Sequence, residues 1–452
     1  MRHFDLLIIG TGSGNSIIGP EHDDWDIAIA EDGVFGGTCL NRGCIPSKML
    51  VVAADTAELA RRGPRLGVHT RFEGADWPAI RDRIFGRIDP IAAGGEEYRR
   101  SLPHVTVYRD TARFVGPRRV VIGDEIVTAD HIVVAVGARP HIPDVDGLAE
   151  VGYHTSDTIM RIDELPRRLI VIGAGYIAAE LGHVFGSLGS EVVFVVRGET
   201  FLRNEDDDIR LRFTECYRHR FEVLCSTQPV AARREGDDIV LEVSVDGDHR
   251  GVRGDAVLVA TGRIPNSDRV DATAGGLAVD HAGYVVVDEY QRTTVEGVWA
   301  LGDVCNPVQL KHTANAEARV VAHNLTHPDE LIAVDHRVVP HAVFGHPQVA
   351  SVGLTERQAL ERGIAYRSHV QPYAAAAYGW ALEDTEGFVK VIADARTRHL
   401  LGAHIIGPQA STLIQQLVQG MVFGQTVDEM ARGQYYIHPA LTEVVEQALL
   451  EL

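Results

Sequence analysis

Short apolar runs alternate with glycine-rich turns through the first part of the chain. An apolar run over residues 4–9 is followed by glycines, a stretch of helical character and a second apolar run at 26–31. The same order returns over 168–197. Continuous apolar runs of this length are typical of buried parallel strands. The pattern predicts two β-α-β units and an α/β architecture.

Beyond about residue 336 the pattern changes. Strand-like runs such as GFVKVIAD and HLLGAHIIG are followed by amphipathic stretches, and the chain ends in GQYYIHPALTEVVEQALLEL. Strands grouped before helices are typical of an antiparallel sheet packed against helices. We therefore expect a separate α+β domain over 336–452.

The first unit carries part of a dinucleotide-binding fingerprint. Gly10 permits a tight turn, and Gly12 lets a pyrophosphate approach the backbone at a helix start. Glu31 ends the second run, about 20 residues on, where a carboxylate binds a ribose diol. Asn15 replaces the third glycine, so we expect the helix to sit slightly farther from the strand. Taken alone, the match also fits a chance glycine-rich turn.

The second unit matches the fingerprint more fully, with Gly173, Gly175 and Ala178. Its second run ends in Val196, with no acid for a ribose 2′-hydroxyl, and Arg197 and Arg203 follow. Arginine suits a 2′-phosphate, so NADPH is favoured over NADH. The alternative is that both arginines are solvated loop residues beside the acidic run 205–208.

Composition narrows the class of protein. The chain has 452 residues, 45% of them hydrophobic, and a formal net charge of −20. This charge disfavours nucleic acid and anionic lipid as partners. The start of the chain has no signal-peptide pattern, and no apolar run is long enough for a membrane span, so a cytoplasmic location is expected. Arginine replaces lysine almost everywhere, which draws attention to the lysines at 48, 311 and 390.

The segment GGTCLNRGCIPSK, residues 36–48, holds two of the five cysteines. Zinc would need further ligand pairs at suitable spacing, which the sequence lacks, so no metal is expected. A structural disulfide across so short a loop would constrain little of the unfolded chain. A redox disulfide between Cys39 and Cys44 is the better interpretation. Gly43 and Pro46 predict that Cys44 begins a helix, whose dipole favours a thiolate, with Lys48 one turn further along.

These motifs, with ATGRIPN, LGDV and the terminal HPALTEVVE, resemble the FAD-dependent pyridine nucleotide disulfide reductases over essentially the whole chain. The resemblance implies an FAD-binding domain over 1–152 that is completed by a central segment at 271–335. It also implies an NADPH-binding domain over 153–270 and a dimerisation domain over 336–452 that forms a homodimer.

The resemblance also implies roles for single residues. Cys39 matches the thiol that attacks substrate, and Cys44 the thiol against the flavin. Lys48 and Glu180 match an ion pair beside the flavin, and Tyr176 a ring that covers it. His438 and Glu443 match an acid/base dyad that faces the cysteines of the other subunit. The remaining expected cofactor-binding residues are Gly37, Thr38, Gly137, Gly262, Gly302 and Asp303.

Longer stretches, including IIGTGSGNSI and LKHTANAEARVVAHNL, resemble most the branch of the family that reduces mycothione, the disulfide of mycothiol. The expected partner is therefore this small-molecule disulfide. Mercuric reductase and large thioredoxin reductases are disfavoured because the chain ends without a second cysteine pair. Two alternatives stay open: an NAD-dependent dihydrolipoyl dehydrogenase, and a non-catalytic flavoprotein that senses redox state.

Overall fold

The computed structural model describes residues 1–245 and 247–452. The chain forms two compact units, each built from three segments. Unit 1 comprises Met1–Ser47, Ala79–His141 and Gly262–His336, and unit 2 comprises Lys48–Pro78, Ile142–Thr261 and Arg337–Leu452. Among the described helices, none is long and apolar enough to cross a membrane.

Unit 1 is built on a seven-stranded sheet in which β3, β2, β1, β6 and β16 run parallel, and β5 and β4 continue antiparallel from β6. In β1, Leu6 and Ile8 pack on one face of the sheet while Leu7 and Ile9 pack on the other. Burial on both faces explains the unbroken apolar run. The strands are β1 (Arg2–Ile9), β2 (Ile27–Ala30), β3 (Val105–Tyr108), β4 (Ala112–Gly116), β5 (Arg119–Ile122), β6 (Glu125–Val134) and β16 (Val298–Ala300).

Between β1 and β2 the structure differs from the prediction. The expected helical stretch is two 3₁₀ turns, η1 (Gly14–Ser16) and η2 (Pro20–His22), and not a continuous α-helix. Gly19 between them is extended, with φ −130° and ψ −178°. A residue before proline is disfavoured in the helical region, and glycine is a poor helix former. The Gly19–Pro20 pair therefore interrupts the helix.

The other elements of unit 1 connect its segments. Two short strands, β7 (Ala138–Pro140) and β15 (Arg263–Pro265), pair antiparallel. The helices of this part of the chain are α1 (Gly37–Arg42), the start of α2 (Cys44–Arg62), most of α3 (Trp77–Ser101), and α7 (Lys311–Thr326), with the 3₁₀ turn η5 (Gly302–Val304).

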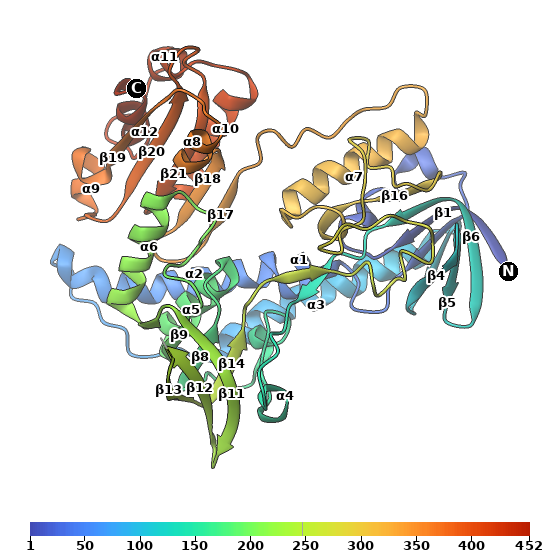
Figure 1. Ribbon diagram of the computed structural model, residues 1–452, viewed down its shortest axis with the longest axis horizontal. Coiled ribbons are helices and arrows are strands. Elements are labelled where there is room, and N and C mark those ends of the chain that lie inside the picture. Colours follow the sequence, from blue (N-terminus) through green and yellow to red (C-terminus); the bar gives the residue numbers. More distant parts are fainter. Residues whose placement is uncertain (246) are drawn as a thin grey trace. The chain divides into compact units, whose positions relative to one another are not determined.

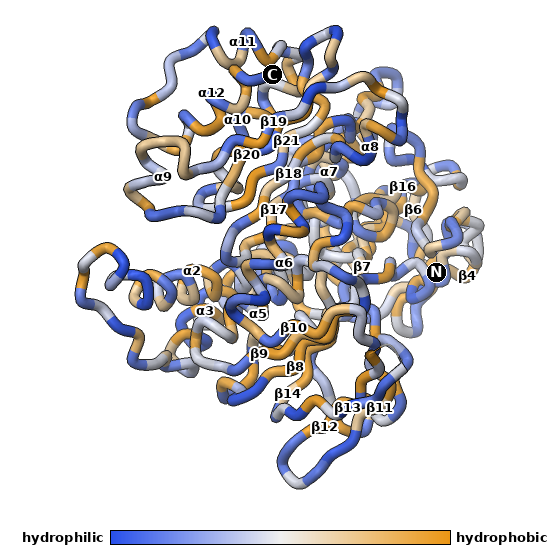
Figure 2. The backbone as a smooth tube through the Cα atoms, turned by 60° about the vertical axis from the view of Figure 1, so that its left-hand side comes forward, coloured by the Kyte–Doolittle hydropathy of each residue, from blue (hydrophilic) through white to orange (hydrophobic). Residues whose placement is uncertain are grey.

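The first part of unit 2 contains a four-stranded parallel sheet in the order β10, β9, β8, β14. Its apolar strands β8, β9 and β14 stand out as orange segments in Figure 2. The strands are β8 (Arg168–Ile172), β9 (Glu191–Val195), β10 (Glu222–Leu224) and β14 (Ala256–Val259), and helices α5 (Tyr176–Leu188) and α6 (Asp207–Arg220) connect them. An antiparallel three-stranded sheet, β11 (Thr227–Glu235), β12 (Asp238–Val245) and β13 (Asp248–Gly254), and the short α4 (Leu148–Val151) complete this part.

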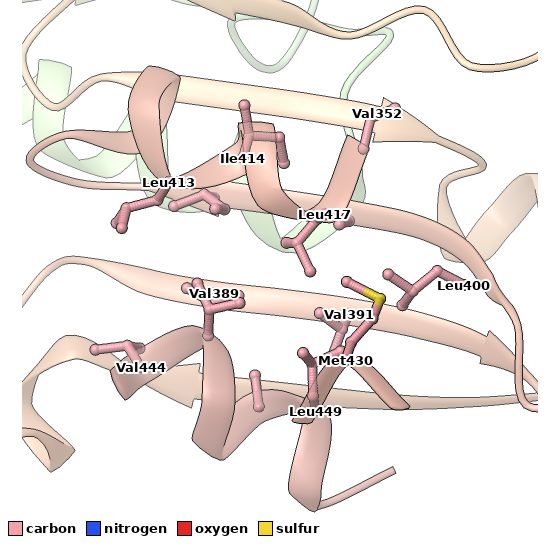
Figure 3. Close-up of a cluster of buried hydrophobic side chains, with 14 of the residues drawn as sticks. Val352, Val389, Val391, Leu400, Leu413, Ile414, Leu417, Met430, Val444 and Leu449 are labelled. Atoms are coloured by element: carbon pink, nitrogen blue, oxygen red, sulfur yellow. The ribbon is translucent and has the colours of Figure 1, made fainter. Parts of the chain in front are cut away.

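The last part of unit 2 is a five-stranded antiparallel sheet with helices, as predicted. Its core packs strand residues such as Val389 and Val391 against Leu417 and Leu449 of the helices (Figure 3). The strands are β17 (His341–Val343), β18 (Val349–Gly353), β19 (Tyr366–Pro372), β20 (Phe388–Asp394) and β21 (Leu400–Ile406). The helices are α8 (Glu356–Glu361), α9 (Ala377–Ala381), α10 (Ala410–Val422), α11 (Val427–Arg432) and α12 (Thr442–Leu450) (Figure 1). The predicted fold class is confirmed.

Candidate functional site

In the first glycine-rich turn, in unit 1, Gly10 and Gly12 differ in whether the fold requires glycine. Gly10 has φ +101°, and a Cβ there would overlap the carbonyl oxygen of Ala135, the residue that follows the neighbouring strand β6. Its glycine is therefore required by the fold. At Gly12 a Cβ would meet only the Cα of Gly37, at 3.9 Å, which is ordinary contact distance. The fold does not require glycine at this position, and the space above it is open.

The turn, the end of β2 and the start of α1 form one hydrogen-bonded assembly. Thr11 donates to Glu31 Oε2 from its backbone N–H (3.0 Å) and from its hydroxyl (2.5 Å), and Gly36 N–H donates to Thr11 Oγ1 (3.0 Å). A Cβ on Gly37, which has φ +69°, would lie 2.6 Å from the Cα of Gly12. Close contact between two glycines holds α1 against the fingerprint turn.

Asn15 does not have the expected effect on packing. The close approach to the strand is made by Gly14, where a Cβ would lie 2.7 Å from the Cβ of Ala135 and 3.0 Å from Ile8. Asn15 instead accepts two hydrogen bonds from the buried Arg99 on α3, Nε to Oδ1 (2.8 Å) and Nη2 to the backbone carbonyl (2.7 Å). The loop is thus held close to the strand without the third fingerprint glycine.

The two cysteines lie at the junction of two helices. Thr38 and Cys39 belong to α1, and Cys44 is the first residue of α2, as predicted. Gly43 separates the helices, and a Cβ there would lie 2.9 Å from the carbonyl oxygen of Thr38. Glycine lets α2 begin directly against α1, which brings the two thiols together. Both residues are thiols in this structure.

The electrostatic surroundings activate Cys39. The pKa of Cys39 is lowered to about 7, chiefly by a hydrogen bond with Cys44 and also by the charge of Lys311, against the opposing effect of burial. Lys311 begins α7 and donates to the hydroxyl of Ser13 (2.7 Å). In the sequence Lys311 stands out only because lysine is rare. This rarity is the signal that could have pointed to its place beside Cys39.

A turn after β16 brings Gly302 and Asp303 to the end of the unit 1 sheet. Gly302 N–H donates to Glu317 Oε2 (2.6 Å), and Asn306 donates to Glu317 Oε1 (2.6 Å). Burial raises the pKa of Asp303. Glu317 is fully buried and was missed by the sequence reasoning, since nothing in its local sequence predicts this contact. Gly137 and Gly262 take positive φ angles of 63° and 119°, with open space around the site of a Cβ.

In the second glycine-rich turn, in unit 2, the first and second glycines have the same roles as in the first turn. Gly173 has φ +136°, and a Cβ there would overlap the carbonyl oxygen of Ala260. Gly175 has φ −83° and caps α5, and a Cβ there would meet nothing within 4 Å. The first glycine is again required by packing, and the second leaves open space at a helix amino end.

Arg197 and Arg203 follow β9 and are both exposed. The neighbouring acids do not neutralise them. Their carboxylates pair with other side chains of unit 2: Glu205 with His341, Asp206 with Lys390, Asp207 with Arg210 and Arg357, and Asp208 with Lys390. Within the described part of the chain, neither arginine has an ion-pair partner.

Lys48 on α2 and Glu180 on α5 are electrostatic neighbours in unit 2. Burial lowers the pKa of Lys48 to about 8, partly opposed by Glu180 and Asp55. Burial raises the pKa of Glu180, although Phe344 N–H donates to its Oε1 (3.0 Å) and Lys48 acts in the opposite direction. Tyr176 lies one turn before Glu180 and is partly exposed.

Further polar side chains of α2, α5 and α6 form a hydrogen-bonded network. His183, fully buried on α5, bonds Asp55 through Nε2 (2.9 Å) and Ser187 through Nδ1 (3.0 Å). Arg220 contacts Glu58 (3.2 Å). These contacts were not predicted from the sequence. The spacing of residues 176, 180, 183 and 187, which places them on one helix face, is a signal that could have predicted them.

His438 and Glu443 are joined as predicted, with Nδ1 of the histidine 2.7 Å from Glu443 Oε1. The His438 side chain is 72% exposed while that of Glu443 is 16% exposed. The carboxylate therefore orients the imidazole and leaves Nε2 facing outward, available to a reacting group.

The sequence is similar to known proteins along its whole length. Residues 4–318 match the family model of pyridine nucleotide-disulphide oxidoreductases, and residues 339–449 match the dimerisation domain of the same group. The chain is 49% identical to mycothione reductase from Mycobacterium tuberculosis over 464 residues, covering all of both chains.

More distant relatives also align over nearly the whole chain. The chain is 34% identical to dihydrolipoyl dehydrogenase of Haloferax volcanii, covering 98% of this chain and 95% of the relative, and 34% identical to mercuric reductase of Streptomyces lividans, covering 97% and 94%. Among solved structures, the Cu(II) complex of the HOCl-induced flavoprotein disulfide reductase from Escherichia coli matches with a TM-score of 0.88 at 25% identity, covering both chains fully.

Proposed function

The chain belongs to the pyridine nucleotide-disulphide oxidoreductase family, whose members depend on FAD and a pyridine nucleotide, and we propose that this enzyme reduces mycothione to two mycothiol molecules with NADPH. The observation that carries the proposal is the pair Cys39 and Cys44 at the junction of α1 and α2, where the pKa of Cys39 lies at about 7. The full-length identity of 49% to a mycothione reductase supports the choice of substrate.

The proposed domain roles follow the sequence boundaries. Residues 1–152 and 271–335 bind FAD, 153–270 bind NADPH, and 336–452 form the interface of a homodimer. The match of 339–449 to a dimerisation domain supports the last assignment. We also propose a cytoplasmic location, where NADPH and thiols are kept reduced.

The residues of unit 1 fit FAD. The open space above Gly12 suits a pyrophosphate, which needs close access to backbone N–H groups. The carboxylates of Glu31 and Asp303 suit ribose and ribityl hydroxyls, and Gly37, Thr38, Gly137, Gly262 and Gly302 are proposed to line the same site. When bound, FAD supplies the two-electron carrier that links the pyridine nucleotide to the cysteine pair.

The residues of unit 2 fit NADPH. Gly173 and Gly175 present the amino end of α5 to a pyrophosphate. Arg197 and Arg203 are exposed with no acidic partner among the described residues, and a guanidinium binds a phosphate through two parallel hydrogen bonds. We propose that both arginines bind the 2′-phosphate and so favour NADPH over NADH.

The thiols perform the disulfide exchange. The Cys39 thiolate attacks one sulfur of mycothione, which forms a mixed disulfide and releases the first mycothiol as a thiolate. Cys44 then attacks Cys39 Sγ, which releases the second mycothiol and forms the Cys39–Cys44 disulfide. Two electrons pass from the cysteine pair to the substrate, and NADPH restores the pair for the next cycle.

Proton transfer is assigned to His438. Its exposed imidazole, held by Glu443, would protonate each departing thiolate. The family resemblance implies that His438 of one copy acts on the cysteines of the other. Lys48, Glu180 and Tyr176 are proposed to lie beside the flavin ring, where the half-buried side chains of Lys48 and Glu180 orient it and the ring of Tyr176 covers it when nicotinamide is absent.

The first test measures NADPH oxidation by the purified protein with mycothione, glutathione disulfide and lipoamide side by side. Fast turnover with mycothione alone supports the proposal. A preference for lipoamide with NADH would instead indicate a dihydrolipoyl dehydrogenase, and no turnover with any of the three would favour a redox sensor.

The second test uses two variants. Cys39→Ser should remain a flavoprotein that NADPH reduces but should lose disulfide turnover, and near wild-type turnover would remove Cys39 from the scheme. His438→Ala should lose at least ~10²-fold in turnover because general acid–base help is removed, whereas an unchanged rate would contradict its role.

A further inference from the structure

The loop that carries Arg197 and Arg203 is fixed at several points before it reaches α6. Ser226 N–H donates to the carbonyl of Gly198 (2.8 Å), and Leu202 N–H donates to the carbonyl of Ala174 in the glycine-rich turn (2.9 Å). Phe201 is fully buried. The loop therefore packs onto the sheet of unit 2 up to Leu202, and Arg203 is the next residue.

Glu205 anchors the loop on the far side of Arg203. Its side chain is 7% exposed, and its two oxygens bond His341 Nε2 (2.5 Å) and Ser351 Oγ (2.5 Å). Burial acts to raise the pKa of Glu205, but the contacts with His341 and Ser351 bring it below its usual range. The carboxylate is thus ionised and held between β17 and β18.

A second buried group anchors the next residue. Lys390, in the middle of β20, is 2% exposed and contacts Asp206 (2.7 Å), Asp208 (2.6 Å) and Glu356 (2.6 Å). The remaining oxygen of Asp206 accepts from the backbone N–H of Glu356 (2.9 Å). Both oxygens of Asp206 are therefore bonded to groups of the C-terminal sheet and its helices, which restrains its position.

Both anchors reach into the segment that matches the dimerisation domain, residues 339–449. The anchors lie two and three residues after Arg203, and they occupy the acids that would otherwise compete for its guanidinium. Phosphate binding by arginine depends on the direction of its planar fork. Small shifts of the loop should therefore weaken the contact with a phosphate.

We propose that His341, Ser351 and Lys390 are positioning residues for coenzyme selectivity: through Glu205 and Asp206 they hold Arg203 toward the 2′-phosphate of the adenosine half of the coenzyme. This inference rests on the proposed use of NADPH. It assigns part of the coenzyme selectivity to side chains of the C-terminal sheet that do not contact the coenzyme.

The test compares the binding of two adenosine nucleotides to the FAD-loaded protein by calorimetry. Adenosine 2′,5′-bisphosphate carries the 2′-phosphate, and 5′-AMP lacks it. Ser351→Ala and His341→Ala should each weaken binding of the bisphosphate about tenfold and leave 5′-AMP binding unchanged. His341→Gln retains a donor for Glu205 and should restore most of the loss.

A matched control is His369→Ala. His369 lies on the same sheet and bonds Gln371 (3.0 Å) and not the loop. This variant should change neither affinity. The ratio of kcat/KM for NADPH to that for NADH should fall in parallel with bisphosphate affinity, and this ratio does not depend on the fraction of protein that is folded.

Three outcomes separate this inference from the proposed function. If Arg203→Met leaves bisphosphate binding unchanged, Arg203 does not bind the phosphate and the positioning inference fails, and if Arg197→Met also leaves it unchanged the proposed NADPH selectivity fails as well. If Arg203→Met weakens it but Ser351→Ala and His341→Ala do not, the positioning inference is overturned while NADPH use stands. Equal weakening of both nucleotides by Ser351→Ala would indicate a general structural role and would also overturn the inference.

Discussion

The two glycine-rich turns each begin with a glycine in the same role, but different structures follow that glycine. Gly10 and Gly173 have positive φ, and their backbone lies against the carbonyl of a residue that directly follows a neighbouring strand, Ala135 after β6 or Ala260 after β14. The second turn then enters a regular helix, α5. The first enters two 3₁₀ turns, and the buried side chain of Arg99 bonds Asn15 in the first of them. Both units thus contain the tight turn at the first glycine, while the type of helix that follows the turn differs between them.

The units also differ in how they treat charge. In unit 1 the strand after the turn is followed directly by Glu31, whose Oε2 accepts hydrogen bonds from Thr11 in the turn and whose Oε1 accepts from Gly33 in the next loop. In unit 2 the corresponding loop presents Arg197 and Arg203, and Glu205 and Asp206 are buried in pairs with His341 and Lys390. The two turns therefore have similar backbones but opposite charges beside them, an acid in unit 1 and two arginines in unit 2.

The largest expected effect on stability comes from replacing the first glycine of each turn. Gly10→Ala and Gly173→Ala should each cost about 2–5 kcal/mol of stability because a Cβ overlaps a backbone carbonyl at a strained φ. Chemical denaturation with FAD release as a second readout measures this. If either variant is as stable as wild type, the two turns are not equivalent.

Arg99→Met tests the support that only unit 1 has. Removing two hydrogen bonds from a buried guanidinium should cost about 2–3 kcal/mol and loosen FAD. Reconstitution of the apoprotein with FAD measures the affinity. The neighbouring Arg100→Met is the control, since Arg100 makes an exposed pair with Glu96 and should change stability by less than about 1 kcal/mol. Equal effects from both variants would remove the special role of Arg99.

Gly175→Ala tests the open space above the second glycine of unit 2. The fold accepts a Cβ there, so stability should change by less than about 1 kcal/mol. The KM for NADPH should nevertheless rise by about tenfold or more because the methyl group occupies the place of the pyrophosphate. Gly94→Ala, also in open space but on α3, should leave KM unchanged. An unaltered KM in Gly175→Ala would contradict nucleotide binding at this turn.

The smallest expected effect concerns Lys311. The rate of Cys39 alkylation should rise with pH through a midpoint at about 7 in the wild type, because the thiolate is the reactive form. Lys311→Met removes a positive charge, so the midpoint should move up and the rate at neutral pH should fall a few-fold. Lys311→Arg keeps the charge and should retain the wild-type midpoint. A midpoint that is the same in Lys311→Met would assign the low pKa to Cys44 alone.

Much of the architecture could be predicted because it depends on short-range rules. Apolar periodicity identified the strands, and glycine and proline spacing located the turns and the start of α2 at Cys44. The helix expected after Gly12 was wrong because the Gly19–Pro20 pair interrupts it and Arg99, 84 residues from Asn15, makes a non-helical loop stable.

The sequence by itself determined the order of the motifs, the cysteine pair and the fold class, since these depend on residue type and spacing. Only the tertiary structure decided which charges meet: Lys311 beside Cys39, Glu317 under Gly302, and Lys390 between Asp206 and Glu356. The partners in these contacts come from segments far apart along the chain or from different elements. The energy of a buried charge depends on which groups surround it after folding, and local pattern carries no information about that.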